Sequence, residues 1–435
     1  YLRGEPGSQK LLVNVRGRVM DTIEKNPFQP GNNLLLTIDS DLQDVAYKAM
    51  GDQKGAVVIL DASNGEILVM LSTPSFDPNK LSLGLTQDEF NVFTRDKNKP
   101  LFNRAIAGQY PPGSTIKPML ALGALEMGIV ESEVYMPCEG KFFLPNYSRP
   151  FNDWETHGSV NVVRAIQASC DVYFYELALK VGIERINKMA TKLGLGIKHD
   201  VPMSAITKGL VPNREWKLNN REQEWLVGDT VNASIGQGYV LASPLQLAVM
   251  AARLASGRKV TPILTKSING QNIHNLKSIE DLEIEKSYLK IVRKALFQAS
   301  NDRRGTAYGS RVINDAYRMA GKTGTSQVRN ITDAERENGV TKNEDLPWKR
   351  RDHGLFINFA PYDKPEIAVA VVVEHGGAGS KSAAPIARDI TLQALFKGKP
   401  PLEVYPAKDR KAVLERQNKL GEVLKELEML RKNKV

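Results

Sequence analysis

Short apolar runs with β-branched side chains occur near both ends of the chain. Ala56–Leu60 and Ile67–Leu71 flank the turn-forming sequence Asp-Ala-Ser-Asn-Gly, and together they predict a β-hairpin. Gly354–Phe359 and Ile367–Val373 flank a turn that contains proline and aspartate, and they predict a second hairpin. Gly321–Thr325 predicts one more strand shortly before that second hairpin.

The middle of the chain is predicted to be mostly helical. Its clearest helical patterns cover Ile116–Met127, Val160–Val181 and Pro244–Ser256. A short strand at Leu34–Asp39 and a helix at Asp41–Met50 are predicted before the first hairpin. Strands at both ends with helices between them predict an α/β chain of the α+β type, in which a central antiparallel sheet is flanked by helices.

The two ends of the chain differ from this central pattern. Residues 1–34 are polar and contain a Pro-Gly break, so we interpret them as a linker or the remnant of a preceding module. Residues 35–400 are predicted to form the main domain. Residues 401–435 are predicted to form a helical tail, because from Ala407 onward charges alternate with leucines in an amphipathic pattern: Leu420, Leu424, Leu427 and Leu430.

Composition narrows the class of protein only in part. With 42% hydrophobic and 25% charged residues, the chain is neither disordered nor fibrous. The formal net charge of +10 would suit nucleic acid, but the basic residues are scattered and no basic stretch interleaved with aromatics accompanies them. We therefore expect no nucleic-acid partner. The chain has no run of eighteen apolar residues, and it begins at Tyr1, so we expect that an N-terminal segment has been removed.

A candidate nucleophile lies where a Pro-Pro-Gly turn leads into a helical pattern. Ser114 is predicted in the first helical turn, and Lys117 follows three residues later on the same face, so the amine can reach the hydroxyl. A serine needs a base, and a lysine serves as one only if burial or the helix dipole lowers its pKa. The same spacing recurs at Ser256–Lys259 and Ser287–Lys290, so an ordinary helix cap fits the spacing equally well.

Two further motifs add to this signal. Ser169 and Asp171 place a hydroxyl and a carboxylate close together in a helical stretch, although Ser75 and Asp77 have the same spacing. Lys322–Gly324, with the sequence Lys-Thr-Gly, is unique in the chain and lies on a predicted strand. A cation, a hydroxyl and a glycine on an exposed strand suit an extended substrate with a terminal carboxylate, because glycine permits a close backbone approach.

The three motifs occur in the order and structural context of the penicillin-binding protein and serine β-lactamase superfamily, which the chain resembles. The resemblance is closer to the penicillin-binding protein 2 family, the monofunctional class B transpeptidases of cell elongation. It covers nearly the whole chain and is carried by these segments: Arg16–Val19, Asn103–Ala105, Gly108–Gly113, Ser234–Tyr239 and Glu374–Gly379.

The resemblance implies the transpeptidase fold and a peptidoglycan D,D-transpeptidase activity. Ser114 would attack the penultimate D-Ala carbonyl of a stem peptide, with Lys117 as the general base. Ser169 would relay a proton to the leaving amine, and Asp171 would lie beside it. Asp171 stands where the broader superfamily has asparagine, and a carboxylate near lysines favours their charged forms.

The same resemblance implies a binding site for the substrate. Lys322, Thr323 and Thr325 would hold the terminal carboxylate of a stem peptide or of a β-lactam, and Gly324 would let the substrate approach. The backbone N–H groups of Ser114 and Thr325 would hold the oxyanion.

Partners and location are likewise implied by the family. The resemblance implies stem peptides ending in D-Ala-D-Ala, β-lactam antibiotics, and a membrane glycosyltransferase and scaffold proteins of the elongation machinery. It places the protein at the periplasmic face of the inner membrane, anchored by an N-terminal helix that lies outside this sequence. A D,D-carboxypeptidase and a β-lactam sensor domain are the alternatives, and a β-lactamase is disfavoured because no deacylation base can be assigned.

Cys138, Asp153, His157 and Cys170 form a second candidate site. From the residues alone, the two cysteines fit either a disulfide or a metal site. Some members of the elongation branch bind zinc at what correspond to these positions, so the resemblance implies a closed, structural zinc site. The first ligand there is usually aspartate, where this chain has Cys138. No organic cofactor is implied.

Overall fold

The computed structural model describes residues 2–418 except 146, 275–278, 333–334 and 336–339. Its centre is a five-stranded sheet, antiparallel throughout, in the order β12-β13-β14-β4-β5. This sheet confirms the predicted fold class and both predicted hairpins. Its strands come from the two ends of the chain: β4 Gly55–Asp61, β5 Ile67–Thr73, β12 Ala320–Ser326, β13 His353–Ala360 and β14 Ile367–Val373.

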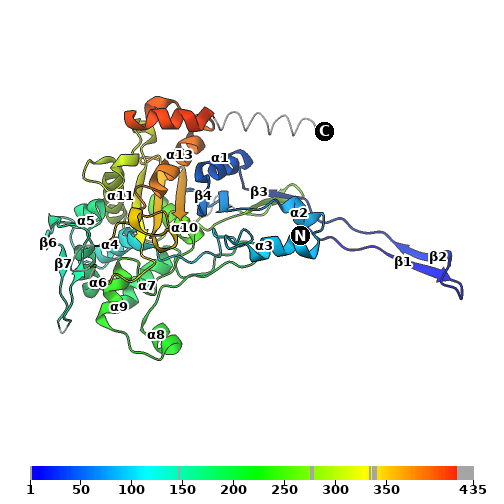
Figure 1. Cartoon of the computed structure of the whole chain (residues 1–435), viewed down its shortest axis with the longest axis horizontal. Helices are drawn as coiled ribbons and strands as arrows, with labels where there is room; N and C mark the ends of the chain where they lie inside the picture. The colour runs from blue at the N-terminus through cyan, green and yellow to red at the C-terminus, as the bar shows by residue number, and fades with distance from the viewer. Residues whose placement is uncertain (1, 146, 275–278, 333–334, 336–339, 419–435) are drawn as a thin grey trace.

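Helices cover both faces of the sheet, and the side chains of β4 show how the faces divide. Alternate residues of a strand point to opposite faces. Ala56, Val58 and Leu60 pack in the core that lies toward the helices drawn below the sheet in Figure 1. Val57 and Ile59 pack in the second core, toward α1 and α13. Both faces are therefore buried, which explains the continuous apolar runs of the central strands.

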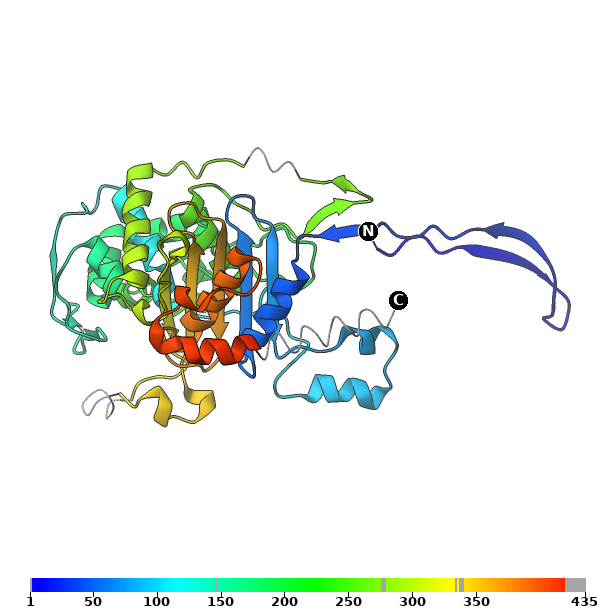
Figure 2. The same ribbon diagram turned by 90° about the horizontal axis from the view of Figure 1, so that it is seen from above.

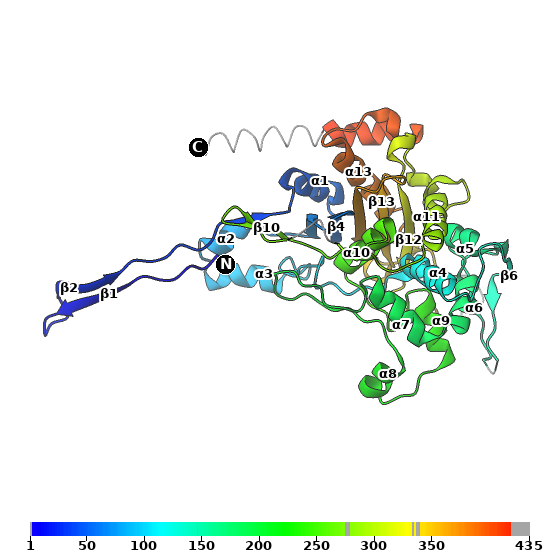
Figure 3. The same cartoon turned by 180° about the vertical axis from the view of Figure 1, so that it is seen from behind.

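The face below the sheet carries most of the helices, and α10 lies directly against β14 and β4 (Figure 3). The predicted helix Pro244–Ser256 is confirmed with those bounds, and Ile116–Met127 is confirmed as a short 3₁₀ turn followed by α4. The helices on this side are α4 Lys117–Glu126, α5 Val162–Ala168, α6 Asp171–Val181, α7 Ile183–Lys192, α8 Arg214–Arg221, α9 Val227–Ser234, α10 Pro244–Ser256 and α11 Lys286–Asn301.

The opposite face is covered by α1, Ser40–Met50, and α13, Ala383–Phe396. The described part of the C-terminal tail adds a helix over 410–418 on this side, as predicted, whereas the four leucines of its expected pattern lie outside the described residues. Other short elements are β3 Leu34–Leu36, α2 Pro78–Ser82, α3 Gln87–Arg95, β6 Met136–Cys138, β7 Lys141–Phe142, β8 Phe151–Asn152, β9 Gly158–Val160, β10 Thr265–Ile268 and β11 Gln271–Asn272.

Residues 1–34, interpreted from the sequence as a linker or the remnant of a preceding module, contain a hairpin of β1, Ser8–Val13, and β2, Val19–Asn26, that extends away from the domain (Figure 2). Two local predictions were wrong. The strand predicted to reach Asp39 ends at Leu36, since the Asp39 side chain accepts from the N–H of Leu42 and caps α1. The predicted helix Val160–Val181 is two helices with a break at Ser169. Among the described helices, none is both long and apolar enough to cross a bilayer.

Candidate active site

The turn before α4 presents Ser114 at the surface of a buried segment. Gly113 has φ +55°, a conformation that glycine adopts readily, and it begins a 3₁₀ turn over Gly113–Ile116. The N–H of Lys117 donates to the carbonyl of Ser114, so the two residues are one turn apart. Ser114 is partly exposed, whereas Lys117 is fully buried. A reactant can therefore reach the hydroxyl while the amine stays shielded from water.

The amine of Lys117 contacts the middle motif. Its Nζ donates to the Ser169 carbonyl at 2.8 Å and to the Ser169 hydroxyl at 3.3 Å. It also forms an ion pair with Asp171 Oδ1 at 2.5 Å. Burial raises the pKa of Asp171, and the neighbouring Lys117 opposes that rise. The Lys117 amine and the Asp171 carboxyl are thus close enough for the protonation state of each to depend on the other.

Ser169 owes its position to a break between two helices. It ends α5 with φ 61° and ψ 39°, a left-handed conformation that few non-glycine residues adopt. Cys170 then caps α6, because its Sγ accepts from the N–H of Tyr173. This break turns the Ser169 carbonyl and hydroxyl and the Asp171 carboxyl toward the same lysine. A continuous helix would have spread these groups around its surface.

The Lys-Thr-Gly strand packs directly against the turn that carries the nucleophile. A Cβ built on Gly324 would lie 2.7 Å from Thr115 Cγ2 and 2.9 Å from the Pro112 carbonyl oxygen. A Cβ on Gly113 would lie 2.6 Å from the carbonyl oxygen of Thr325. All three distances are far below ordinary contacts of a carbon atom, so glycine is required on each side for this approach.

Lys322 is buried on the same strand. Its Nζ donates to the carbonyl of Thr323 at 3.2 Å. Burial lowers the pKa of Lys322 well below its usual range, the charge of Lys117 lowers it further, and Asp171 opposes both effects. An anionic group that bound beside Lys322 would favour its charged form. Lys117, Asp171 and Lys322 therefore form one electrostatically coupled cluster, beside the turn that carries Ser114.

Three residues that the sequence interpretation did not select also position this cluster. Gln237 Nε2 donates to the Thr325 carbonyl at 3.1 Å, and the Thr306 hydroxyl lies 2.8 Å from that of Thr323. Trp154 Nε1 donates to the Ser169 carbonyl at 3.3 Å. Gln237 lies in one of the segments that carried the resemblance, and that was a usable signal. Thr306 and Trp154 belong to no sequence motif, so nothing in the sequence indicated that they lie at the site.

The second candidate set also converges in space. Cys138 ends β6, Asp153 and His157 lie between β8 and β9, and Cys170 caps α6. One ligand atom from each of the four residues lies within 4.8 Å of all the others. The two sulfurs are 2.8 Å apart, and both cysteines are free. Cys138 Sγ lies 3.4 Å from Asp153 Oδ2.

The burial and the ionisation of these four residues are compatible with a bound cation. The His157 side chain is 3% exposed, and its Nε2 lies 3.4 Å from Asp153 Oδ1. Burial alone would raise the pKa of Asp153, but hydrogen bonds from His157 and from the Val172 N–H outweigh it and bring the pKa to about 2. Burial raises the pKa of the Cys170 thiol, and a bound metal ion would reverse that direction.

The partly exposed Ser114 lies beside the buried Lys117, in a turn that packs against the Lys-Thr-Gly strand of an antiparallel sheet. This arrangement defines the class of active-site serine acyltransferases with the penicillin-binding fold. The family model described as the penicillin binding protein transpeptidase domain matches residues 55–392. The chain belongs to this family.

Individual relatives identify the branch that the chain resembles. The peptidoglycan D,D-transpeptidase MrdA of Acinetobacter baumannii is 38% identical over 88% of the chain, and the match spans 58% of that relative's length. A crystal structure of Pseudomonas aeruginosa PBP2 in complex with WCK 5153 superposes with a TM-score of 0.77, at 36% identity, over 88% of this chain and 80% of that one. A Helicobacter pylori PBP2 in complex with MreC also superposes with a TM-score of 0.77, at 32% identity, over 91% and 70%. The resemblance to the penicillin-binding protein 2 family is thereby confirmed.

Proposed function

We propose that this protein is a peptidoglycan D,D-transpeptidase that cross-links stem peptides during cell elongation. The observation that carries the proposal is the buried amine of Lys117, held by Ser169 and Asp171 one turn from the accessible hydroxyl of Ser114. Such an arrangement supplies an accessible nucleophile together with a base and a proton relay that are shielded from water.

The first half of the reaction forms an acyl-enzyme. In the reactive form of the Lys117–Asp171 pair the proton lies on the carboxyl, so the Lys117 amine can accept the Ser114 proton as the oxygen attacks the carbonyl carbon of the penultimate D-Ala. We assign the oxyanion to the backbone N–H groups of Ser114 and Thr325. As the peptide C–N bond breaks, the Ser169 hydroxyl, which lies 3.3 Å from Lys117 Nζ, passes the proton on to the leaving D-Ala amine.

The second half transfers the acyl group. An amine of a neighbouring stem peptide attacks the ester carbonyl, loses a proton through the same relay, and the Ser114 oxygen leaves and recovers its proton. During the first half of the reaction, Lys322, Thr323 and Thr325 hold the terminal carboxylate of the first peptide. That carboxylate leaves with the released D-Ala before the acyl transfer begins. A β-lactam presents its own carboxylate to the same strand and acylates Ser114 without a leaving group that diffuses away.

A D,D-carboxypeptidase would use the same residues with water as the acceptor, so the acceptor must be tested directly. The protein is incubated with un-cross-linked, lipid-linked peptidoglycan, and the digested products are separated by mass spectrometry. We expect cross-linked dimers to accumulate with wild-type protein and to be absent with Ser114→Ala. Release of free D-Ala without dimers would contradict the transpeptidase assignment and favour the carboxypeptidase. Persistent acylation by penicillin without processing of either peptide would favour the sensor.

Location and partners follow from the relatives only as proposals. The match spans 58% of the length of the Acinetobacter relative. As the family resemblance implies, we propose that the full protein has an N-terminal membrane anchor and acts at the periplasmic face of the inner membrane. The Helicobacter PBP2 forms a complex with MreC. We propose that this protein likewise engages a scaffold protein and a membrane glycosyltransferase of the elongation machinery.

We further propose a structural zinc site at the four-residue cluster. Cys138, Asp153, His157 and Cys170 supply two thiolates, a carboxylate and an imidazole, the donor set of a closed tetrahedral site. When bound, the ion would tie the end of β6 and the segment between β8 and β9 to the start of α6, and it would leave the chemistry to the serine site. Cys170 would thereby fix the segment that carries Ser169 and Asp171.

The zinc content of the purified protein should depend on the four-residue cluster. We expect about one zinc per chain in wild-type protein by elemental mass spectrometry, loss of that zinc in His157→Asn, and a fall in Tm of more than about 5 °C. His274→Asn, at an exposed histidine, is the matched control and should keep both zinc and Tm. Zinc-free wild-type protein with Cys138 and Cys170 oxidised to each other would rule this site out.

A further inference from the structure

The Lys-Thr-Gly strand is packed on both of its faces at Gly324. The turn that carries Ser114 lies on the side of α4, where the neighbouring Leu355 also points. Gly354 points to the opposite face, and a Cβ built on it would lie 3.3 Å from Gly379 Cα. A Cβ on Gly379 would in turn collide with the carbonyl oxygens of Gly324 and Leu355. The position of β12 therefore depends on the position of Gly379.

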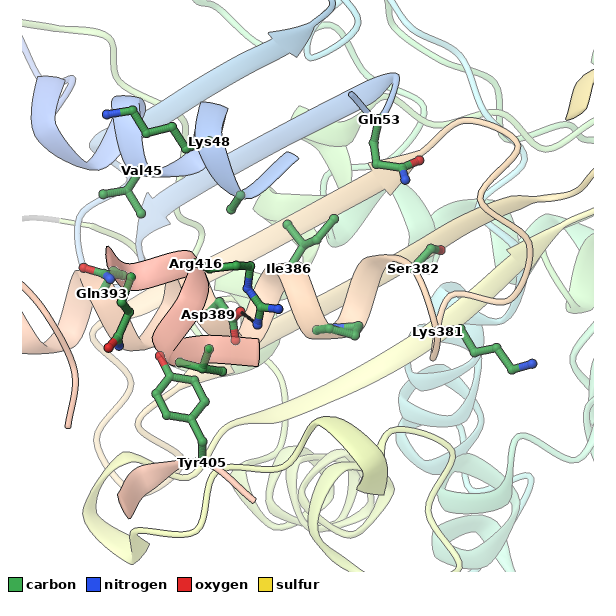
Figure 4. A pocket seen from close by; sticks show the side chains of 14 residues that line it. Val45, Lys48, Gln53, Lys381, Ser382, Ile386, Asp389, Gln393, Tyr405 and Arg416 are labelled. Atoms are coloured by element: carbon green, nitrogen blue, oxygen red, sulfur yellow. Dashed lines mark hydrogen bonds and ion pairs between the residues drawn. The ribbon is translucent and has the colours of Figure 1, made fainter. Parts of the chain in front are cut away.

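Gly379 belongs to the connection between β14 and α13, which runs over residues 374–382. Figure 4, a view of the cavity between α1 and α13, shows its last two residues, Lys381 and Ser382, where α13 begins. Near its start, His375 has φ 56°, a left-handed conformation that few non-glycine residues adopt. Such a conformation persists only where the surrounding structure holds it. The path of the connection thus depends on what holds His375.

His353, the first residue of β13, holds His375 by its backbone. The N–H of His375 donates to His353 Nδ1 at 2.9 Å, and the two imidazole rings lie 4.7 Å apart. A ring nitrogen that accepts a hydrogen bond carries no proton, so His353 is neutral in this arrangement. Burial and the neighbouring His375 lower the pKa of His353 to about 4, whereas the Glu374 carboxylate opposes them. The acceptor is therefore present at neutral pH.

His353 also contacts the segment that leads to the nucleophile. Its ring meets that of Tyr110 edge to face, with the ring centroids 5.6 Å apart. The Tyr110 hydroxyl donates to Glu374 at 2.8 Å, and Arg104 forms an ion pair with the same carboxylate at 3.0 Å. In the register of the sheet, His353 lies opposite Ser326 of β12. The connection after β14, the strand β12 and the segment before Ser114 thus meet around one imidazole.

We propose that His353 is a positioning residue of the acylation reaction, an inference that rests on the proposed transpeptidase function. Its Nδ1 holds the His375 backbone, and the connection over 375–379 then supports the Lys-Thr-Gly strand beside Ser114. The role requires a hydrogen-bond acceptor at the position of Nδ1 and no proton transfer by the imidazole. Without that acceptor, the strained backbone at His375 loses a restraint, and Gly379 and β12 move together.

Three substitutions of His353 separate the acceptor from the bulk of the ring. Asparagine places an amide oxygen close to the position of Nδ1, glutamine places its amide group near that of Nε2, and leucine has no acceptor. We expect the second-order rate constant for acylation by a fluorescent penicillin to stay within about threefold of wild type in His353→Asn and to fall about tenfold or more in His353→Gln and His353→Leu, since a displacement of 1 Å can cost about 10²-fold in rate. The Asn and Gln variants should have similar Tm values. If His353→Leu does not fold, these two variants decide the test.

A second buried histidine provides the matched control. His199 is 5% exposed, and its Nε2 lies 2.9 Å from the Gly194 carbonyl oxygen. Burial lowers its pKa to about 4, as it does for His353. His199→Leu removes a hydrogen bond between an imidazole and the backbone away from the connection after β14, and it should acylate within about threefold of wild type.

The outcomes separate the positioning role from the proposed function. Equal acylation rates in His353→Asn and His353→Gln, or a wild-type rate in His353→Leu, would overturn the positioning role. Acylation as slow in His199→Leu as in His353→Leu would overturn it too, because any lost buried histidine would then have the same effect. A wild-type protein that penicillin did not acylate would instead contradict the transpeptidase function itself.

Discussion

Replacing Lys117 by methionine is expected to slow acylation of Ser114 about 10²- to 10⁴-fold, the usual contribution of a positioned general base. Methionine fills similar space but cannot accept the serine proton. It also leaves Asp171 without the partner that now lies 2.5 Å away, so some folding stability is lost as well. The second-order rate constant for a fluorescent penicillin, together with the Tm, measures both effects.

A second buried lysine provides the matched control. Lys217 is 2% exposed and pairs with Asp229 at 2.6 Å, so Lys217→Met removes an ion pair of similar burial elsewhere in the domain. We expect this variant to lose stability to a comparable degree and to acylate within about threefold of wild type. If the two variants acylated equally slowly, Lys117 would act only through the fold, and its assignment as the base would be wrong.

Gly324→Ala is expected to slow acylation about tenfold to a hundredfold. The new methyl group would lie 2.9 Å from the Pro112 carbonyl and 2.7 Å from Thr115 Cγ2, so β12 must move away from the turn that carries Ser114. Displacement of reacting groups by even 1 Å can cost about 10²-fold in rate. Because the strand moves as a unit, Lys322 shifts as well, and the loss should appear in both the affinity for penicillin and the acylation step.

Gly309→Ala separates this effect from the general cost of adding a methyl group. A Cβ on Gly309 would meet only the flexible end of Lys408, at 3.8 Å. This control should acylate like wild type. Wild-type acylation by Gly324→Ala would mean that the close packing of strand and turn is not needed for the chemistry.

The central sheet could be predicted from the sequence because its signals are local. Apolar runs such as Ala56–Leu60 and turn residues between them specify a hairpin within about twenty residues. The hairpin over Ser8–Asn26 was missed for the converse reason. Every residue of both its strands is exposed, so no face is apolar and no alternation marks it.

The candidate site could be predicted only in its residue types. The pattern of Val160–Val181 is continuously apolar on one side, and nothing in it indicates the left-handed Ser169 that divides α5 from α6. That break depends on contacts made at a distance, such as Lys117 Nζ to the Ser169 carbonyl. The sequence shows that Asp171 replaces the asparagine of the broader superfamily. That Asp171 pairs with Lys117 rather than with Lys322 can be seen only in the three-dimensional structure.

Intact-protein mass spectrometry after exposure to penicillin tests the central claim most directly. The wild-type chain should gain the mass of one penicillin, and proteolysis should place that mass on the peptide containing Ser114. Ser114→Ala should gain nothing under the same conditions. A single stable adduct on any other residue, or an adduct on Ser114→Ala, would contradict the assignment of this serine as the nucleophile.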